Sequence, residues 1–239
     1  MNPAELEALL LVQERDTALD RLRHRRASLP ERAELEAATS ARARAATTRA
    51  EVQTQHAAVA AEERRLDDEA RALGERAADV DKRMYSGTIT SPRELQAMQA
   101  DVEMLKRQRS DLEDEELEVM ERREALDHEL ASCDETIATL SATIDRLTAT
   151  ISTAEAEIDA DVAIESSARA EAAKPVGDAL LRDYEKRRAQ NRGAGAARLV
   201  GTTCQACHLT IPSTEAEHIR RTEGREVSYC DNCSAILVP

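Results

Sequence analysis

The sequence predicts a mostly α-helical chain with a small β domain at its C-terminal end, and three observations lead to this fold class. Charged residues make up 33% of the 239 residues and aromatic residues only 1%, a composition typical of long helices and coiled coils. The chain holds only 7 glycines and 6 prolines, so turns are few. Apolar residues recur with a heptad period through most of the chain, and four of the five cysteines lie close together near its end.

The first helical arm is predicted to begin at Pro3, with Asn2 as its N-cap. Pro30 interrupts it, because proline removes a hydrogen-bond donor and restricts the residue before it. We therefore expect a kink near residues 28–30. Beyond the kink, residues 31–84 contain no proline, and their alanine-rich seam predicts a thin coiled-coil strand. Its heptad positions are Val52, Val59, Leu66, Leu73 and Val80.

A turn is predicted near residues 85–91, where Gly87 lies among serine and threonine residues. Ser91 and Glu94 form a capping box, and Pro92 fits the first position of a second long helix. That helix continues a heptad pattern over many turns. Its a positions run Leu95, Val102, Arg109, Glu116, Arg123, Leu130, Ile137, Ile144, Ile151 and Ile158, and its d positions run Met98, Leu105, Leu112, Val119, Leu126, Cys133, Leu140, Leu147, Ala154 and Asp161.

The two arms, residues 3–84 and 92–173, are nearly equal in length around one short turn. Equal arms favour an antiparallel hairpin within one chain, since it needs only a short loop. A parallel dimer formed through the second helix is the alternative. We expect residues 1–173 to form this kinked hairpin. Residues 174–198 are expected to form a basic helix, 178–190, followed by a flexible hinge at 191–197.

The remaining segment, residues 199–239, is too short and too poor in large apolar groups to fold on its core alone. Short strands are predicted at 209–211, 226–229 and 235–238, with a brief helix from Thr214 that ends by Gly224. Two Cys-x-x-Cys pairs, separated by about 22 residues, have the spacing of a structural zinc site. We expect one zinc ion per chain, bound by Cys204, Cys207, Cys230 and Cys233.

Other interpretations of the cysteines and histidines stay open. A Cys-x-x-Cys pair can also form a thiol–disulfide redox centre, although that needs only one pair, in an α/β setting that is not visible here. His208 and His218 are candidate substitute ligands or surface groups. Cys133 falls on the heptad seam, where a small buried apolar residue fits.

Charge shapes the expected partners. The formal net charge of −14 disfavours binding of nucleic acid or anionic lipid by the whole molecule. Two local basic clusters are candidate nucleic-acid or partner-binding sites, although they can equally pair with acidic residues on solvated faces. The clusters are Arg21, Arg23, Arg25 and Arg26, and Lys186, Arg187, Arg188, Arg192 and Arg198.

The hairpin tip carries polar groups where packing demands little. Tyr85, Arg93 and Glu94 can form a partner-docking tip or simply belong to a capped turn. The chain shows neither a signal peptide nor an apolar run long enough to span a membrane, so cytoplasmic localisation is expected.

With these pieces placed, the chain resembles a bacterial family of four-cysteine zinc-ribbon proteins that carry a long N-terminal coiled-coil hairpin. The residues that carry the resemblance are the tip segments 85–87 and 91–99, the Cys204-x-x-Cys207-His208 motif and the Cys230-x-x-Cys233 motif. Ser234 stands where the family usually has glycine, which would strain the second cysteine turn slightly. The resemblance implies a cytoplasmic binding protein, not an enzyme. Relatives are associated with an alternative sigma factor of RNA polymerase and with flagellar gene expression, and RNA binding is suggested for them.

We therefore expect a non-catalytic zinc-binding adaptor that engages a protein partner, such as a sigma factor or RNA polymerase by resemblance. An RNA- or DNA-binding protein that uses the ribbon and the basic connector is the alternative, and a thiol redox enzyme is the third candidate. The expected oligomeric state is a monomer or a weak dimer.

Overall fold

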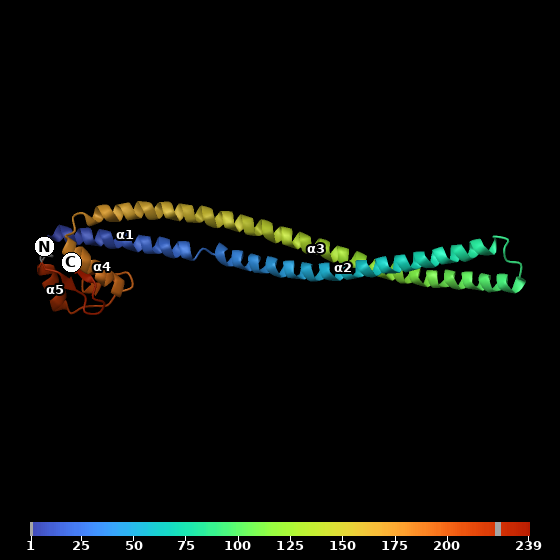
Figure 1. Cartoon of the computed structure of the whole chain (residues 1–239). Helices are drawn as coiled ribbons and strands as arrows, with labels where there is room; N and C mark the ends of the chain where they lie inside the picture. Colours follow the sequence, from blue (N-terminus) through green and yellow to red (C-terminus); the bar gives the residue numbers. More distant parts are fainter. Residues whose placement is uncertain (1, 223–225) are drawn as a thin grey trace. The chain divides into compact units, whose positions relative to one another are not determined.

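The computed structural model describes residues 2–222 and 226–239. Its elements are α1 (Pro3–Ala27), α2 (Glu31–Met84), α3 (Pro92–Ala173), α4 (Asp178–Gln190), β1 (Ala196–Val200), β2 (Thr203–Cys204), α5 (Ser213–Arg221), β3 (Ser228–Tyr229) and β4 (Ile236–Val238) (Figure 1). The predicted fold class, a helical hairpin with a small C-terminal sheet, is confirmed. No helix of the described residues is long and apolar enough to cross a membrane.

The chain divides into two compact units, residues 34–146 and residues 1–33 with 147–239. In the first, α2 and α3 run antiparallel. His56 lies 2.9 Å from Asp127, and Arg49 lies 2.5 Å from Asp134. As the position rises along one arm, that of its partner falls along the other. The predicted intrachain hairpin is therefore correct for this unit.

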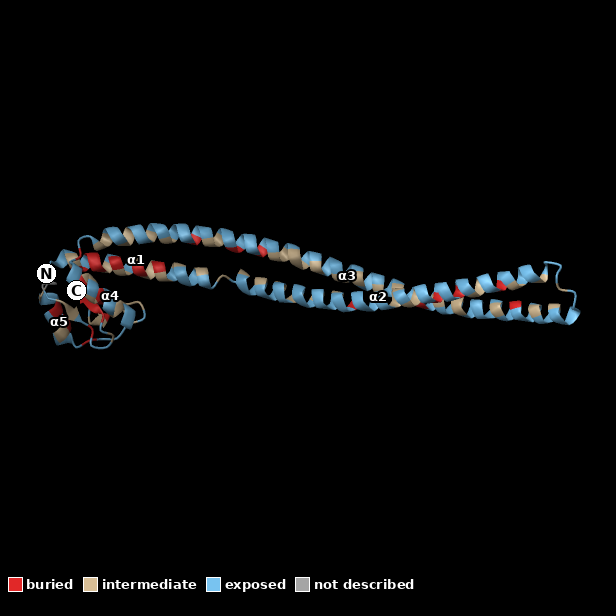
Figure 2. Ribbon diagram, viewed as in Figure 1, coloured by how far each residue is buried: buried red, intermediate tan, exposed pale blue. Residues whose placement is uncertain are grey.

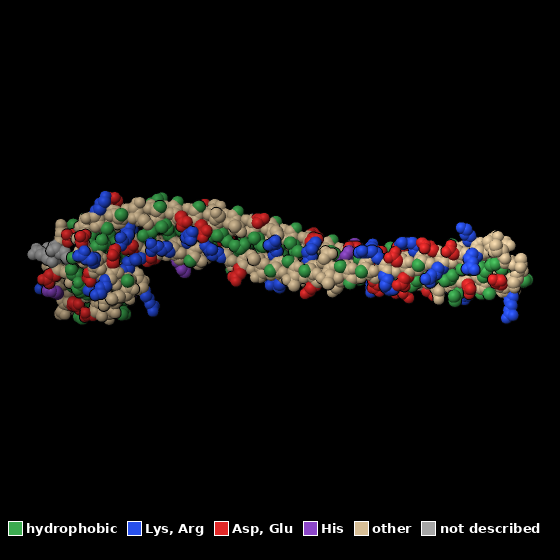
Figure 3. Space-filling model, in the orientation of Figure 1, with side chains coloured by type: hydrophobic (Ala, Val, Ile, Leu, Met, Phe, Trp, Pro, Cys, Tyr) green, Lys and Arg blue, Asp and Glu red, His purple; other side chains and the backbone are tan. Residues whose placement is uncertain are grey.

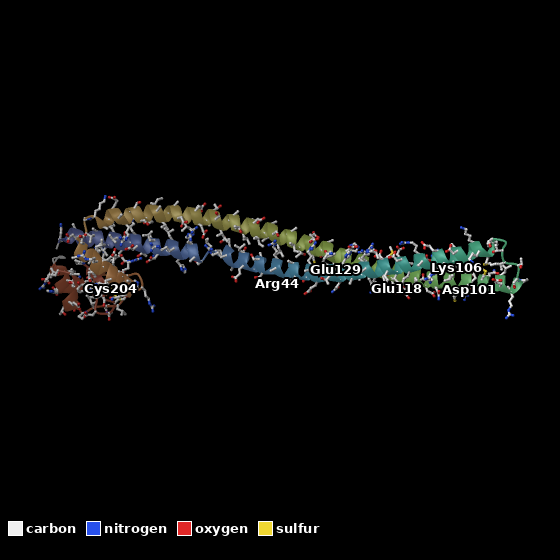
Figure 4. All side chains as sticks on the ribbon, viewed as in Figure 1. Arg44, Asp101, Lys106, Glu118, Glu129 and Cys204 are labelled. Carbon is white, nitrogen blue, oxygen red and sulfur yellow. The ribbon has the colours of Figure 1, made fainter. Side chains whose placement is uncertain are left out.

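The seam of this unit follows the predicted heptads (Figure 2). Leu66 is only 1% exposed, and small alanines beside it let the two helices approach closely. The buried seam residues are Val52, Leu66, Ala70, Ala77, Val102 and Val119. Charged residues on the outer faces are exposed, including the five labelled in Figure 4: Arg44, Asp101, Lys106, Glu118 and Glu129.

Two of the charged residues at heptad a positions behave differently. Arg123 reaches across to Glu63 on α2, with Nη1 2.5 Å from the carboxylate, whose side chain is 15% exposed. Arg109 is exposed and pairs within its own helix with Glu113, at 2.6 Å. The apolar seam is thus replaced by an interhelical ion pair at Arg123, whereas the Arg109 side chain lies over Gly74 of α2.

The helix boundaries follow local chemistry. Asn2 accepts a hydrogen bond from the Ala4 amide at 3.1 Å, so it caps α1 as predicted. Helix α1 ends at Ala27 and α2 begins at Glu31, directly after Pro30, so the break lies at residues 28–30 as predicted. Helix α3 begins at Pro92, directly after the tip turn.

The second unit contains α1, the last part of α3, α4 and the ribbon. Its sheet has the strand order β2-β1-β4-β3, with β1 parallel to β4 and antiparallel to β2, and β3 antiparallel to β4. One core joins this sheet to the helices. It comprises Leu6, Leu9 and Val12 of α1, Leu180 and Tyr184 of α4, and Ala196, Ile236 and Val238 of the strands.

Several details differ from the sequence predictions. The expected flexible hinge at 191–197 is wrong at its C-terminal end, because Ala196 and Ala197 are buried in β1. The expected strand 209–211 is reduced to an isolated bridge between Thr210 and Thr203. Helix α5 ends at Arg221, and the predicted limit, Gly224, lies outside the described residues.

Candidate metal centre and arginine clusters

The two Cys-x-x-Cys segments form turns of the same construction. In each, the amide of the first cysteine donates to a carbonyl five residues later, Leu209 for Cys204 at 3.1 Å and Ala235 for Cys230 at 2.9 Å. The carbonyl of the first cysteine accepts in return from the amide four residues later, at 2.8 and 2.7 Å respectively. Each turn therefore presents both of its sulfur atoms toward one point. We call these two turns the knuckles.

The knuckles bring all four sulfur atoms together, and Figure 4 labels Cys204 within the ribbon. The Sγ atoms lie within 4.8 Å of one another. Across the knuckles, Cys204 and Cys233 are 3.9 Å apart, and Cys207 and Cys230 are 3.8 Å apart. A tetrahedral zinc with bonds of about 2.3 Å would separate its sulfur ligands by about 3.8 Å, so the four residues fit one structural zinc.

The thiols differ in acidity because their surroundings differ. Burial raises the pKa of Cys204, and it raises the pKa of Cys233 to about 12. The pKa of Cys207 is lowered, chiefly by the hydrogen bond from the Leu209 backbone. Because zinc binds thiolates, metal binding at this cluster must release protons. Four thiolates also complete the tetrahedron, which leaves no position for a reactive water.

Each knuckle contains a residue in the left-handed region. His208 and Ser234 directly follow the second cysteine of their knuckles and have φ values of 58° and 60°. This conformation favours glycine and is uncommon for other residues. The strain expected at Ser234 from the sequence thus has a structural basis, and His208 adopts the same conformation at the equivalent position. Both side chains are exposed, as is His218, and none joins the four-sulfur cluster.

The ribbon is fixed to the hairpin by polar residues of α1 that sequence analysis missed. The Gln13 amide donates to the Gly193 carbonyl at 2.9 Å and accepts from the Gly195 amide at 2.7 Å. Asp16, only 3% exposed, accepts from the Tyr184 hydroxyl and from Arg169 Nε, each at 2.8 Å. The only signal in the sequence was that Gln13 and Asp16, two polar residues, lie on the otherwise apolar face of α1.

Most residues of the two predicted basic clusters are neutralised. Arg187 pairs with Asp183 at 2.9 Å and stacks 3.7 Å from the centroid of the Tyr229 ring. Arg198 pairs with Glu7 of α1 at 2.6 Å. Arg23, Arg26 and Arg188 also form ion pairs with acidic residues of α1 or α3. Within the described residues, no ion pair involves Arg21, Arg25, Lys186 or Arg192.

The remaining predicted residues lie outside the ribbon. At the hairpin tip, Tyr85 is 80% exposed, and Arg93 and Glu94 are exposed as well. Docking through the tip stays a prediction. Cys133 is half-buried on the seam of α3, as expected for a packing residue.

A helical hairpin whose base carries a packed four-cysteine ribbon defines a class of coiled-coil zinc-ribbon proteins. The chain belongs to the family described as the CT398-like coiled coil hairpin domain, whose model matches residues 12–192. The model of the C4-type zinc ribbon domain matches residues 203–237. The resemblance drawn from the sequence is thereby confirmed for the family, and the four clustered cysteines form its zinc site.

Known relatives share this architecture. An uncharacterized protein of Mycobacterium tuberculosis, Rv2229c, is 30% identical over 98% of this chain and 95% of its own length. A solved structure from Mycobacterium smegmatis is 28% identical, covers 100% of this chain and 99% of its own, and superposes with a TM-score of 0.71. CT398 from Chlamydia trachomatis covers 98% of this chain and 96% of its own, with a TM-score of 0.69. At 15% identity, it shows the fold alone.

Proposed function

We propose that this protein is a non-catalytic adaptor, which binds a protein partner through a surface that zinc stabilises at the base of the hairpin. The observation that carries the proposal is the shared core of ribbon and helices. Ile236 and Val238 of β4 pack with Leu9 of α1 and Tyr184 of α4. The ribbon is therefore held in one orientation on its helices, as a recognition surface requires.

The chemistry of the metal site supports a structural role. A closed set of four thiolates stabilises a fold that is too small to stabilise itself, but it offers no open coordination position to a substrate. A thiol redox function would need one exposed, acidic thiol beside a resolving partner. Here Cys204, which is buried, and Cys233, which is half-buried, have raised pKa values. The pKa of Cys207 is lowered, but this half-buried thiol is one of the four sulfur ligands of the closed site.

The partner class that the family resemblance suggests is a component of the transcription machinery, such as an alternative sigma factor, in the cytoplasm. A second candidate is RNA or DNA binding, favoured by Arg21, Arg25 and Arg192 of the basic clusters, which form no ion pair within the described residues. The acidic balance of the chain and the ion pairs of the other arginines count against it.

Affinity capture from the native cell, with and without nuclease, distinguishes the two. An adaptor should capture the same protein in both samples, and the Cys230→Ser variant, which cannot complete the zinc site, should lose it. Loss of the captured protein after nuclease treatment would contradict the adaptor role and favour nucleic-acid binding. An Arg44→Glu variant, altered on an exposed face of α2, is the control.

A further inference from the structure

A groove of about 900 Å³ runs between α1 and the segment that leads into the ribbon. One wall is a single face of α1, from Leu10 through Thr17 and Arg21 to Arg25. The opposite wall comprises residues 192–198 and the first knuckle at Gln205 and Ala206. All of these residues belong to one compact unit of the chain. Figure 3 shows basic and acidic side chains mixed over this part of the molecule.

The fixed charges along the groove leave a positive excess. Asp20 is neutralised by Arg188 and Arg23. Arg198 pairs with Glu7. The exposed Glu14 also lines the groove, forms no ion pair within the described residues, and offsets one positive charge. The cations that remain are exposed and form no ion pair within the described residues: Arg21, Arg25 and Arg192.

The groove is also preformed. Gln13 lies in its wall and bonds to the backbone of Gly193, Gly195 and Ala196, which fixes the opposite wall against α1. Arg192 has a φ of 49°, an uncommon conformation for a residue other than glycine. Leu10, Ala194 and Ala206, which are half-buried, contribute apolar surface beside the arginines. A ligand therefore meets a groove whose backbone walls are already in place, so no loop has to be ordered on binding.

These features favour a short acidic peptide segment over a nucleic acid. Guanidinium groups bind carboxylates in a planar, two-point geometry, and a short peptide brings only a few negative charges to a chain whose net charge is −14. Among the described residues that line the groove, the only ring is the small imidazole of His24, and no tyrosine lies there on which bases could stack. Apolar residues that alternate with the carboxylates can contact Leu10 and the two alanines.

We propose that this groove binds an acidic, partly apolar peptide segment of the protein partner, with its carboxylates held by Arg21, Arg25 and Arg192. The inference rests on the proposed adaptor function and locates the surface that the partner contacts. The direct test is fluorescence polarisation with the zinc-loaded full chain. The probes are a labelled peptide of alternating Glu and Leu, the matching Gln–Leu peptide, and a labelled polyuridine oligonucleotide of equal length.

The Glu–Leu peptide should bind, and reversal of all three groove arginines to glutamate should weaken binding about tenfold or more, since each exposed pair contributes modestly. The same reversal at Arg42, Arg44 and Arg76, which are exposed on α2, changes the net charge equally and should weaken it far less. A triple arginine-to-glutamine variant covers the case in which charge reversal disturbs folding. Zinc content and circular dichroism verify that each variant is folded.

Three results would overturn the proposal: no binding of the Glu–Leu peptide, equal binding by the groove variants, or preferential binding of polyuridine through the same arginines. Affinity capture separates this failure from that of the adaptor function. If the groove variant still captures the nuclease-resistant partner, the adaptor role stands and the partner contacts another surface. If neither the wild-type protein nor any variant captures a nuclease-resistant protein partner, the adaptor role itself fails.

Discussion

The buried carboxylate of Asp16 is expected to hold the base of the hairpin together, and Asp16→Ala tests this directly. Its Oδ2 accepts from the Tyr184 hydroxyl and its Oδ1 from Arg169 Nε, each at 2.8 Å, while Arg188 Nε lies 3.7 Å away. The tyrosine is fully buried, so truncating Asp16 leaves its hydroxyl without an acceptor. Such an orphaned group costs about 1–3 kcal/mol.

The arginines moderate the loss. Arg169 keeps Glu185 at 3.1 Å and Arg188 keeps Asp20, and both side chains are about one quarter exposed, at 25% and 22%. We therefore expect a free energy loss of about 3 kcal/mol, the lower end of the range for a broken buried ion pair. Tyr184→Phe, which leaves the carboxylate paired with arginine, should cost only about 1 kcal/mol.

Hydrogen–deuterium exchange with peptide resolution is the assay. Amides of α1, α4 and β1 should exchange about a hundredfold faster in Asp16→Ala, because about 3 kcal/mol corresponds to roughly two decades in the opening equilibrium. Peptides from residues 34–146 serve as an internal standard, and Asp79→Ala, at an exposed position of α2, is the matched control. A change in α1 no larger than that of the control would refute the reasoning. In the double variant Asp16→Ala/Tyr184→Phe, the loss should be smaller than the sum, since no hydroxyl is orphaned.

Three further variants probe the ribbon and its attachment. Cys230→Ser should abolish stoichiometric zinc binding and unfold the ribbon while α2 and α3 keep most of the helical circular dichroism signal; retained zinc would contradict the four-thiolate assignment. Gly195→Ala should destabilise the ribbon by about 1–3 kcal/mol, because a Cβ there would meet the Tyr184 ring at 2.5 Å. Gly177→Ala meets open space and should cost only about 0.5–1 kcal/mol in thermal unfolding, because alanine is a poorer N-cap of α4 than glycine. Ser234→Gly should raise the thermal stability of the ribbon by up to about 1 kcal/mol by relieving the left-handed backbone; a lower stability would show that Ser234 carries no net strain.

The hairpin and the metal site could be predicted because their signals are local and repeated. The heptads of α2 and α3 recur many times, so single exceptions such as Arg109 do not hide them. The two cysteine pairs have a spacing that few other structures require. Both signals can be read without knowing which distant segment lies opposite.

The attachment of the ribbon could not be predicted for the opposite reason. Gln13 bonds to Gly195, which is 182 residues away in the chain, and Asp16 bonds to Tyr184 across 168 residues. Neither side chain belongs to a motif, so no local pattern marks it. The Gly193-Ala194-Gly195 segment looks like a hinge by composition, yet Gly195 is small because the Tyr184 ring packs against it. From the sequence alone, a glycine that close packing requires cannot be distinguished from a glycine in a flexible segment.

The alternation of side chains along β1 and β4 connects the zinc site to the helices. Leu237 faces the core that contains Cys204 and Cys230, while its neighbours Ile236 and Val238 face the core shared with α1 and α4. Successive residues of a strand point to opposite faces, so the same short strand serves both cores. Zinc that stabilises one face must therefore stabilise the other by linkage. It follows that chelation should speed amide exchange in α1 and α4 as well as in the ribbon, while α2 peptides stay protected. Equal amide exchange rates in α1 and α4 with and without zinc would show that these helices are stable without the ribbon.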